Sequence, residues 1–169
     1  MKSIYFLFLL SGCFTASSQA VGFFGGKSLL PAEYMAIQYF HPSNYPVQFT
    51  VKLFGEGSKR NSLRYVSYGA CLGFDYSSTQ SSMEPPFLSY RFLLGALIQR
   101  EQERWVQNNQ QQQARTGFGC MGEVMGTWHL SSAFILSVFG QQRWMWKPIL
   151  GKQEFVLGLG LIYQLNTDY

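Results

Sequence analysis

The sequence is short of charge and of long hydrophobic runs. Charged residues make up 13% of its 169 residues, about half the share found in an ordinary soluble domain. Beyond the first residues, no apolar run approaches the ~20 residues that a transmembrane helix needs. The composition therefore excludes a helical membrane protein, and the length suits a single domain.

Basic clusters and catalytic motifs are also missing. The formal net charge is +4, and no lysine or arginine stripe offers a surface for a phosphate backbone, so we expect no direct binding to nucleic acid. The two histidines, His41 and His129, have no cysteine, histidine or carboxylate at metal-ligand spacing. No nucleophile motif or phosphate-binding glycine loop appears. We therefore expect no enzymatic activity, no cofactor and no bound metal.

The first twenty residues have the pattern of an export signal. Lys2 supplies the positive end, Ile4–Leu10 form an apolar core, and Ser18-Gln19-Ala20 is a small-residue cleavage pattern. We expect cleavage after Ala20. Residues 21–169 would then form one mature domain outside the cytoplasm.

One of the three cysteines lies in this export segment, and the other two lie in the mature chain. Cys13 allows lipoprotein processing as an alternative, although the very short apolar core before it favours ordinary cleavage. Cys71 lies on the small-residue face of its segment, whereas Cys120 alternates with large apolar residues. If both residues are in strands, they point to opposite sides of the sheet and cannot form a disulfide.

Aromatic residues are abundant, at 17%, and apolar residues alternate with small or polar ones. The clearest case is Phe155–Asn166. One face of this stretch carries Phe155, Leu157, Leu159, Leu161, Tyr163 and Leu165, and the other carries Val156, Gly158, Gly160, Ile162 and Gln164. A period of two over this length predicts a β-strand.

The same alternation predicts strands throughout the mature chain. The expected strands are 21–26, 33–40, 47–53, 63–76, 88–98, 118–130, 133–139 and 155–166. Between them we expect a turn at Gly55–Ser62, a solvated loop at Gln99–Thr116 and a tight turn at Ser131-Ser132. An antiparallel barrel with both ends in the periplasm needs an even number of strands. The count reaches eight only if Val21–Gly26 is a strand.

Three charged residues within the predicted strands, Lys52, Arg91 and Glu123, fall opposite the large apolar residues. A charge on the lipid-facing side of a barrel costs about 2–4 kcal/mol at the bilayer midplane, so this phase predicts that all three face a lumen. The interior of an eight-stranded barrel is just wide enough for side chains to fill. We expect Glu123 to pair with Arg91 or Lys52 and to plug the lumen rather than line an ion path.

Five aromatic residues are candidates for the membrane–water interface, and several of them fall with the large apolar set near strand ends. They are Tyr90, Trp128, Trp144, Trp146 and Tyr163. Rings with one polar edge are favoured where a bilayer meets water. We predict that these residues form interfacial belts and that outer-membrane lipid surrounds the strands.

These patterns predict an all-β fold, namely a small antiparallel up-and-down outer-membrane β-barrel of about eight strands. Two alternatives stay open. One is an outer-membrane barrel with a general structural or adhesion role. The other is a soluble periplasmic β-barrel that binds an apolar ligand, which would place the large apolar face inward and the three strand charges outward.

Five segments carry a more specific pattern. They are Tyr45–Val51, which ends in Gln-Phe-Thr-Val, the glycine-rich Ser67–Asp75, Gly119–Leu130 with its glutamate, Gln142–Trp146 with arginine before tryptophan, and Leu157–Asn166. In order and spacing, from Tyr34 to Asn166, they resemble the TraO family of conjugative-transposon proteins of Bacteroidetes. The longer tract Gln99–Thr116, and Lys52 in place of an acidic residue, depart from the family pattern.

The resemblance implies a non-enzymatic component of a conjugative DNA-transfer apparatus at the outer membrane. Its expected partners are other conjugative-transfer proteins. The family supplies no catalytic residues that could be assigned to this chain.

Overall fold

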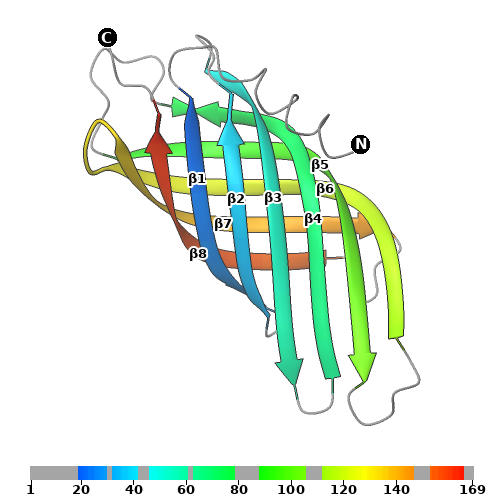
Figure 1. Cartoon of the computed structure of the whole chain (residues 1–169). Coiled ribbons are helices and arrows are strands. Elements are labelled where there is room, and N and C mark those ends of the chain that lie inside the picture. The colour runs from blue at the N-terminus through cyan, green and yellow to red at the C-terminus, as the bar shows by residue number, and fades with distance from the viewer. Residues whose placement is uncertain are drawn as a thin grey trace, which may run out of the picture.

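The computed structural model describes residues 19–29, 32–41, 46–60, 63–78, 88–105, 112–146 and 153–165. Eight antiparallel strands close into one barrel (Figure 1). The strands are β1 Ala20–Ser28, β2 Glu33–Phe40, β3 Val47–Arg60, β4 Leu63–Ser77, β5 Leu88–Trp105, β6 Gln112–His129, β7 Phe134–Trp146 and β8 Gln153–Gln164. No helix in this part of the chain is long and apolar enough to cross a membrane.

The topology is up-and-down, because each strand pairs with its neighbours in sequence and β8 pairs with β1. Ala20 lies opposite Gln164, and Phe24 lies opposite Gly160. The predicted eight-stranded antiparallel barrel is confirmed, including a first strand at Val21–Gly26, which lies within β1. The end of the barrel where β1 begins and β8 ends is called the termini end, and the opposite end is called the extended end.

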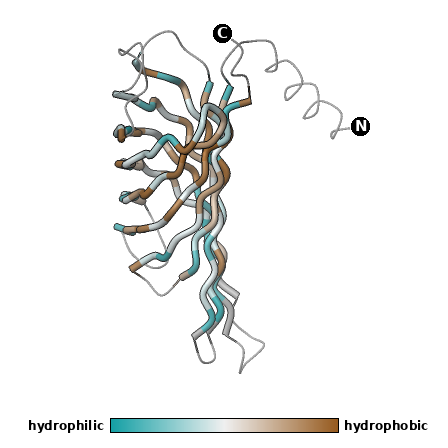
Figure 2. Tube along the Cα trace, turned by 90° about the vertical axis from the view of Figure 1, so that its left-hand side faces the viewer, coloured by the Kyte–Doolittle hydropathy of each residue, from teal (hydrophilic) through white to brown (hydrophobic). Residues whose placement is uncertain are grey.

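The two faces of β8 lie as their sequence pattern predicts. Leu157 and Leu159 are 54% and 60% exposed on the outside, whereas Val156 and Ile162 are fully buried inside. The central part of the barrel is accordingly the most hydrophobic part of the chain trace, with hydrophilic residues toward both ends (Figure 2). A soluble barrel with its large apolar face inward is the opposite arrangement, so that alternative is wrong.

The turn predicted at Gly55–Ser62 is wrong for most of its length. Strand β3 continues to Arg60 and pairs with β4 from Leu63, so that Gly57 lies opposite Val66. Small and polar residues suggested a turn. Backbone pairing with β2 and β4 overrides that local preference, because strand propensity depends strongly on what the strand packs against.

The solvated loop predicted at Gln99–Thr116 is also mostly strand. Strand β5 extends to Trp105 and β6 begins at Gln112, with Arg100 opposite Thr116. The tract is polar because β3–β6 project beyond the other strands at the extended end (Figure 1). Strand β7 likewise continues to Trp146, past the predicted end at Phe139.

The predicted tight turn at Ser131-Ser132 is confirmed at the termini end. The Leu130 N–H donates to the Phe134 carbonyl over 3.0 Å. The Ser131 hydroxyl accepts hydrogen bonds from the N–H groups of Ala133 and Phe134, at 3.3 and 3.1 Å. This short connection joins β6 to β7.

Glycines on the inner face make room for rings that cross the barrel. Gly158 lies opposite Gly26 in the β1–β8 pair. A Cβ at Gly158 would lie 2.7 Å from the Phe139 ring and 2.8 Å from the Gly26 Cα. The interior therefore has no room at this point for even one methyl group.

We expect Gly158→Ala to lower the free energy of unfolding by about 1–3 kcal/mol, the usual cost of overpacking a dense interior. Gly25→Ala is the matched control, because a Cβ there meets no atom within 4 Å. Its effect should stay within about 0.5 kcal/mol. Urea unfolding of the refolded protein in lipid vesicles measures both. Equal stabilities of the two variants would contradict the tight inner packing.

Candidate functional site

The charged interior of the barrel is organised by β3. Gln48, Lys52 and Glu56 recur at every fourth residue of this strand and face inward, because alternate residues of a strand share one face. Each of the three contributes to a different level along the barrel axis. The interior contains three ion-pair layers. The terminal layer lies near Gln48 toward the termini end, the central layer contains Lys52, and the far layer contains Glu56 toward the extended end.

The central layer is the ion pair between Lys52 and Glu123. Both side chains are fully buried, and the two residues are 71 positions apart in the sequence. The Lys52 ammonium also lies 4.6 Å from the ring centroid of Phe24 and 5.1 Å from that of Phe139. Arg91 and Lys52 were the two partners expected for Glu123, and Glu123 pairs with Lys52.

The terminal layer joins Arg91 to Asp75. Arg91 Nε donates to Asp75 Oδ2 over 2.8 Å, and its Nη2 donates to Gln48 Oε1 over 3.2 Å. The guanidinium carbon lies 4.1 Å from the centroid of the Phe40 ring. Arg91 faces inward as predicted, but its partner Asp75 was missed. The alternation through Phe74 would have placed Asp75 on the inner face.

The far layer surrounds Arg143. Its guanidinium is ion-paired with both Glu56 and Glu154, the latter at 2.9 Å, and Nη1 donates to Gln99 Oε1 over 3.2 Å. The Phe54 ring centroid lies 4.9 Å from the guanidinium carbon. The sequence prediction missed the whole layer because the predicted strands ended too early. Glu56 was assigned to a turn, Arg143 lay past a strand end, and Glu154 lay before a strand start.

Large side chains fill the space between these layers. Tyr34, Phe139, Met121 and Met125 are all fully buried. The Tyr34 hydroxyl donates to Gln141 Oε1 over 3.0 Å. Buried charges are stable only when each meets a partner, and here each layer pairs its cation directly. This arrangement holds strands together across the barrel and fills the lumen.

The predicted interfacial aromatics all lie on the outside, in two groups. Trp144 and Trp146 are exposed at the extended end of β7. Tyr90, Tyr163 and the half-buried Trp128 lie near the termini end. Their positions near the two ends of the strands suit the predicted belts, and the belt role stays a prediction.

Cys71 and Cys120 are both free, as their strand phase predicts. Cys71 is buried inside the barrel, whereas Cys120 lies opposite the outward-facing Ala96 and Trp144. Ala20 is the first residue of β1 and lies opposite Phe40. Cleavage after Ala20 stays a prediction, and the rest of the predicted export segment, including Cys13, lies outside the described residues.

Within the described ranges, no group of three or more histidine, cysteine, aspartate or glutamate residues could hold a metal ion. His129 lies at the termini end, with Nε2 3.5 Å from the Ser89 hydroxyl. The Ser89 hydroxyl in turn lies 2.5 Å from that of Thr127.

Comparison with solved structures identifies the fold. The N-terminal β-barrel domain of OprF from Pseudomonas aeruginosa superposes with a TM-score of 0.66 at 12% identity, covering 88% of this chain and 98% of that domain. Neisserial surface protein A gives 0.60 at 13% identity, covering 88% and 95%. Ail, the attachment invasion locus protein of Yersinia pestis, gives 0.57 at 11% identity, covering 88% and 97%.

The chain has the fold of the small outer-membrane β-barrels. At these identities the similarity concerns the fold alone. No protein-family model and no curated protein matches the sequence.

We expect Glu123→Gln to lower the free energy of unfolding by about 3–5 kcal/mol, because it leaves the buried Lys52 ammonium without its counter-charge. The double variant Lys52→Met/Glu123→Leu should recover most of this loss, since it removes both charges. Glu33→Gln, at an exposed position, is the control and should change stability by less than about 0.5 kcal/mol. Urea titrations of the refolded barrel measure all three. A double variant no more stable than the single one would contradict the proposed pairing.

Proposed function

We propose that this protein is a closed outer-membrane barrel that acts as a non-enzymatic structural component of a conjugative DNA-transfer apparatus. The membrane part of the proposal is carried by the contrast between the two surfaces of the barrel wall, and the transfer part rests on the sequence resemblance. The inner surface is sealed by three ion-pair layers and packed rings. The outer surface presents large apolar side chains, a property of a barrel embedded in lipid.

Membrane insertion follows from the energetics of the outer surface. Phe74, Leu94 and Leu159 are 63%, 68% and 60% exposed, and they belong to a set that covers every strand. Removing such a side chain from water contributes about 1.5–3 kcal/mol. Lipid is therefore the solvent that stabilises this surface. With both chain ends in the periplasm, the extended end of β3–β6 would reach outside the cell.

The resemblance to the TraO family is consistent with the interior network. Three of the segments that carry the resemblance each supply one member of a different ion-pair layer. Asp75 belongs to the terminal layer, Glu123 to the central layer and Arg143 to the far layer. Each of these charged residues needs its partner inside the barrel, so the resemblance includes positions that stabilise the fold.

A filled lumen points to a scaffold and not to a conduit. DNA could not pass through an interior occupied by Arg143, Lys52 and their partners. The protein would instead anchor or organise other transfer proteins from within the membrane. A general structural or adhesion role is the second candidate. The projection of β3–β6 beyond the barrel favours it, since this projection offers a surface outside the bilayer.

The membrane role has a direct test. The full chain should fractionate with the outer membrane, and its folded band should shift on heating before gel electrophoresis. In planar bilayers it should give no steady conductance. Glu123→Leu should lower the free energy of unfolding strongly, while the conductance should change little. A soluble protein without a mobility shift, or a large steady conductance in the unmodified barrel, would overturn the role as a closed membrane barrel.

The transfer role is tested in donor cells that carry the element encoding this chain. Deletion of the coding sequence should lower the frequency of DNA transfer by at least about tenfold, while growth is unchanged. Expression of the intact chain should restore transfer, and so should Gly25→Ala, which leaves the barrel packing untouched. An unchanged transfer frequency in the deletion strain would leave the general structural or adhesion role as the better explanation.

A further inference from the structure

The outer surface at the extended end changes from apolar to cationic over a few residues. Paired positions form a last apolar row that consists of Ile37, Leu53, Ala70, Ile98 and Phe118. The next row outward contains Gly55, Tyr68 and Arg100. Beyond it, Lys59 lies opposite Arg64 in the β3–β4 pair. Lys59, Arg64 and Arg100 are all exposed.

Among the described residues these three cations take part in no ion pair, in contrast to the three interior cations. Glu33 is the nearby carboxylate on the outer face, and it lies opposite Lys27 in the β1–β2 pair. The outer face at this end is therefore left with a net positive charge.

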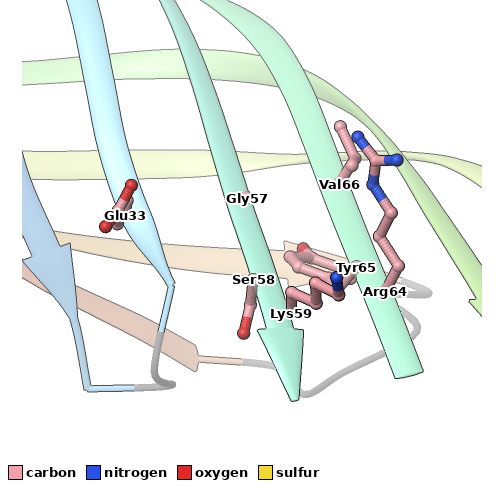
Figure 3. A pocket seen from close by; sticks show the side chains of 7 residues that line it. All are labelled: Glu33, Gly57, Ser58, Lys59, Arg64, Tyr65 and Val66. Atoms are coloured by element: carbon pink, nitrogen blue, oxygen red, sulfur yellow. The ribbon is translucent and has the colours of Figure 1, made fainter. Parts of the chain in front are cut away.

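A pocket of about 640 Å³ opens beside this charge. It lies where β2 begins next to β3, because Glu33, the first residue of β2, pairs with Gly57 and β3 continues beyond this pair to Arg60. The outward positions Lys59 and Arg64 line it with Glu33, Gly57 and Val66, and the inward positions Ser58 and Tyr65 complete its lining (Figure 3). A Cβ at Gly57 would meet no atom within 4 Å, so open space lies above the strand there.

We propose that this pocket, with Lys59 and Arg64 as its ligands, binds the phosphorylated headgroup of a membrane lipid. Arg100, which lies opposite Tyr68 on the outer face of β5, adds to the positive charge of this end. The inference rests on the membrane location given in the proposed function, and it is independent of the role in DNA transfer. Exposed cations at the level of a bilayer surface attract anionic headgroups, and each cation contributes a similar amount to the binding free energy.

The position of the pocket selects a lipid over a soluble anion. The apolar row begins at Leu53, four residues along β3 from Gly57, and Met35 lies between them on β2 opposite Gly55. Met35 and Leu53 are both exposed on the outside. A phosphate held by Lys59 and Arg64 would therefore have its acyl chains against the apolar wall of the same strands.

The experiment uses the full chain refolded in detergent and native mass spectrometry to count bound lipids. The probes are a bisphosphorylated glycolipid, its dephosphorylated form and phosphatidylcholine. The phosphorylated form should bind most tightly. Arg64→Gln and Lys59→Gln should each weaken its binding about fivefold, and the double variant about twenty-five-fold. Glu33→Gln should strengthen binding, because it removes a carboxylate from the pocket wall.

Arg115→Gln is the matched control. Arg115 is also exposed and lies on the projecting part of β6, but in the strand phase of Gly117 and Met121, which face inward. Its replacement removes the same charge and should change lipid binding less than about twofold, since it lies on the opposite face of the sheet. Equal effects of Arg64→Gln and Arg115→Gln would overturn the proposed site and leave only a general charge effect.

Three further outcomes separate the identity of the ligand from the membrane location. Displacement of the glycolipid by millimolar inorganic phosphate would mean that the pocket holds a free anion, which would overturn the assignment to a lipid. Equal binding of all three probes by a folded, heat-modifiable barrel would overturn the pocket and leave the membrane location intact. A chain that shows no heat-modifiable folded form would instead count against the membrane location itself.

Discussion

The pairing of charges inside a closed, water-poor barrel is the constraint on which the rest of this structure depends. A buried ammonium or guanidinium is tolerated only beside a counter-charge, because the interior cannot solvate it. Lys52 meets Glu123, Arg91 meets Asp75, and Arg143 lies between Glu56 and Glu154. The pairs of Lys52 with Glu123 and of Glu56 with Arg143 join strands that are not neighbours in the barrel. The other two pairs join neighbouring strands, namely β4 with β5 and β7 with β8. Charge pairing and barrel closure therefore support each other.

The width of an eight-stranded barrel explains why the interior combines such charges with rings and glycines. Side chains from facing walls must interdigitate in a space that they just fill. Phe24 and Phe139 meet edge to face, with ring centroids 5.5 Å apart and Lys52 above both. Gly158 leaves the space that the Phe139 ring needs. The barrel thus gains a solid polar core, and its apolar residues are left to the outside.

The two ends of the barrel differ in a way that bears on function. At the termini end, β6 and β7 are joined by the tight turn at Ser131-Ser132. At the extended end, β3–β6 project beyond their neighbours and carry Lys59, Arg64 and Arg100 on the outer face. In a bilayer, a barrel whose cationic strands project at one end has a built-in orientation. Interactions with headgroups and with partners would concentrate at the projecting end.

The sequence by itself determined the central parts of the strands, their number and the face on which each residue of these parts lies. A period of two is a local property, so the inward phase of Lys52, Arg91 and Glu123 could be read without tertiary structure. Asp75 could have been found in the same way. Only the tertiary structure decided where strands end and which charges meet. Glu56 and Arg143 lie in polar stretches whose strand pairing depends on neighbouring strands. Glu123 pairs with Lys52 and not with Arg91 because of the positions of these residues along the barrel axis. The register between strands sets these positions, and no single strand contains that information.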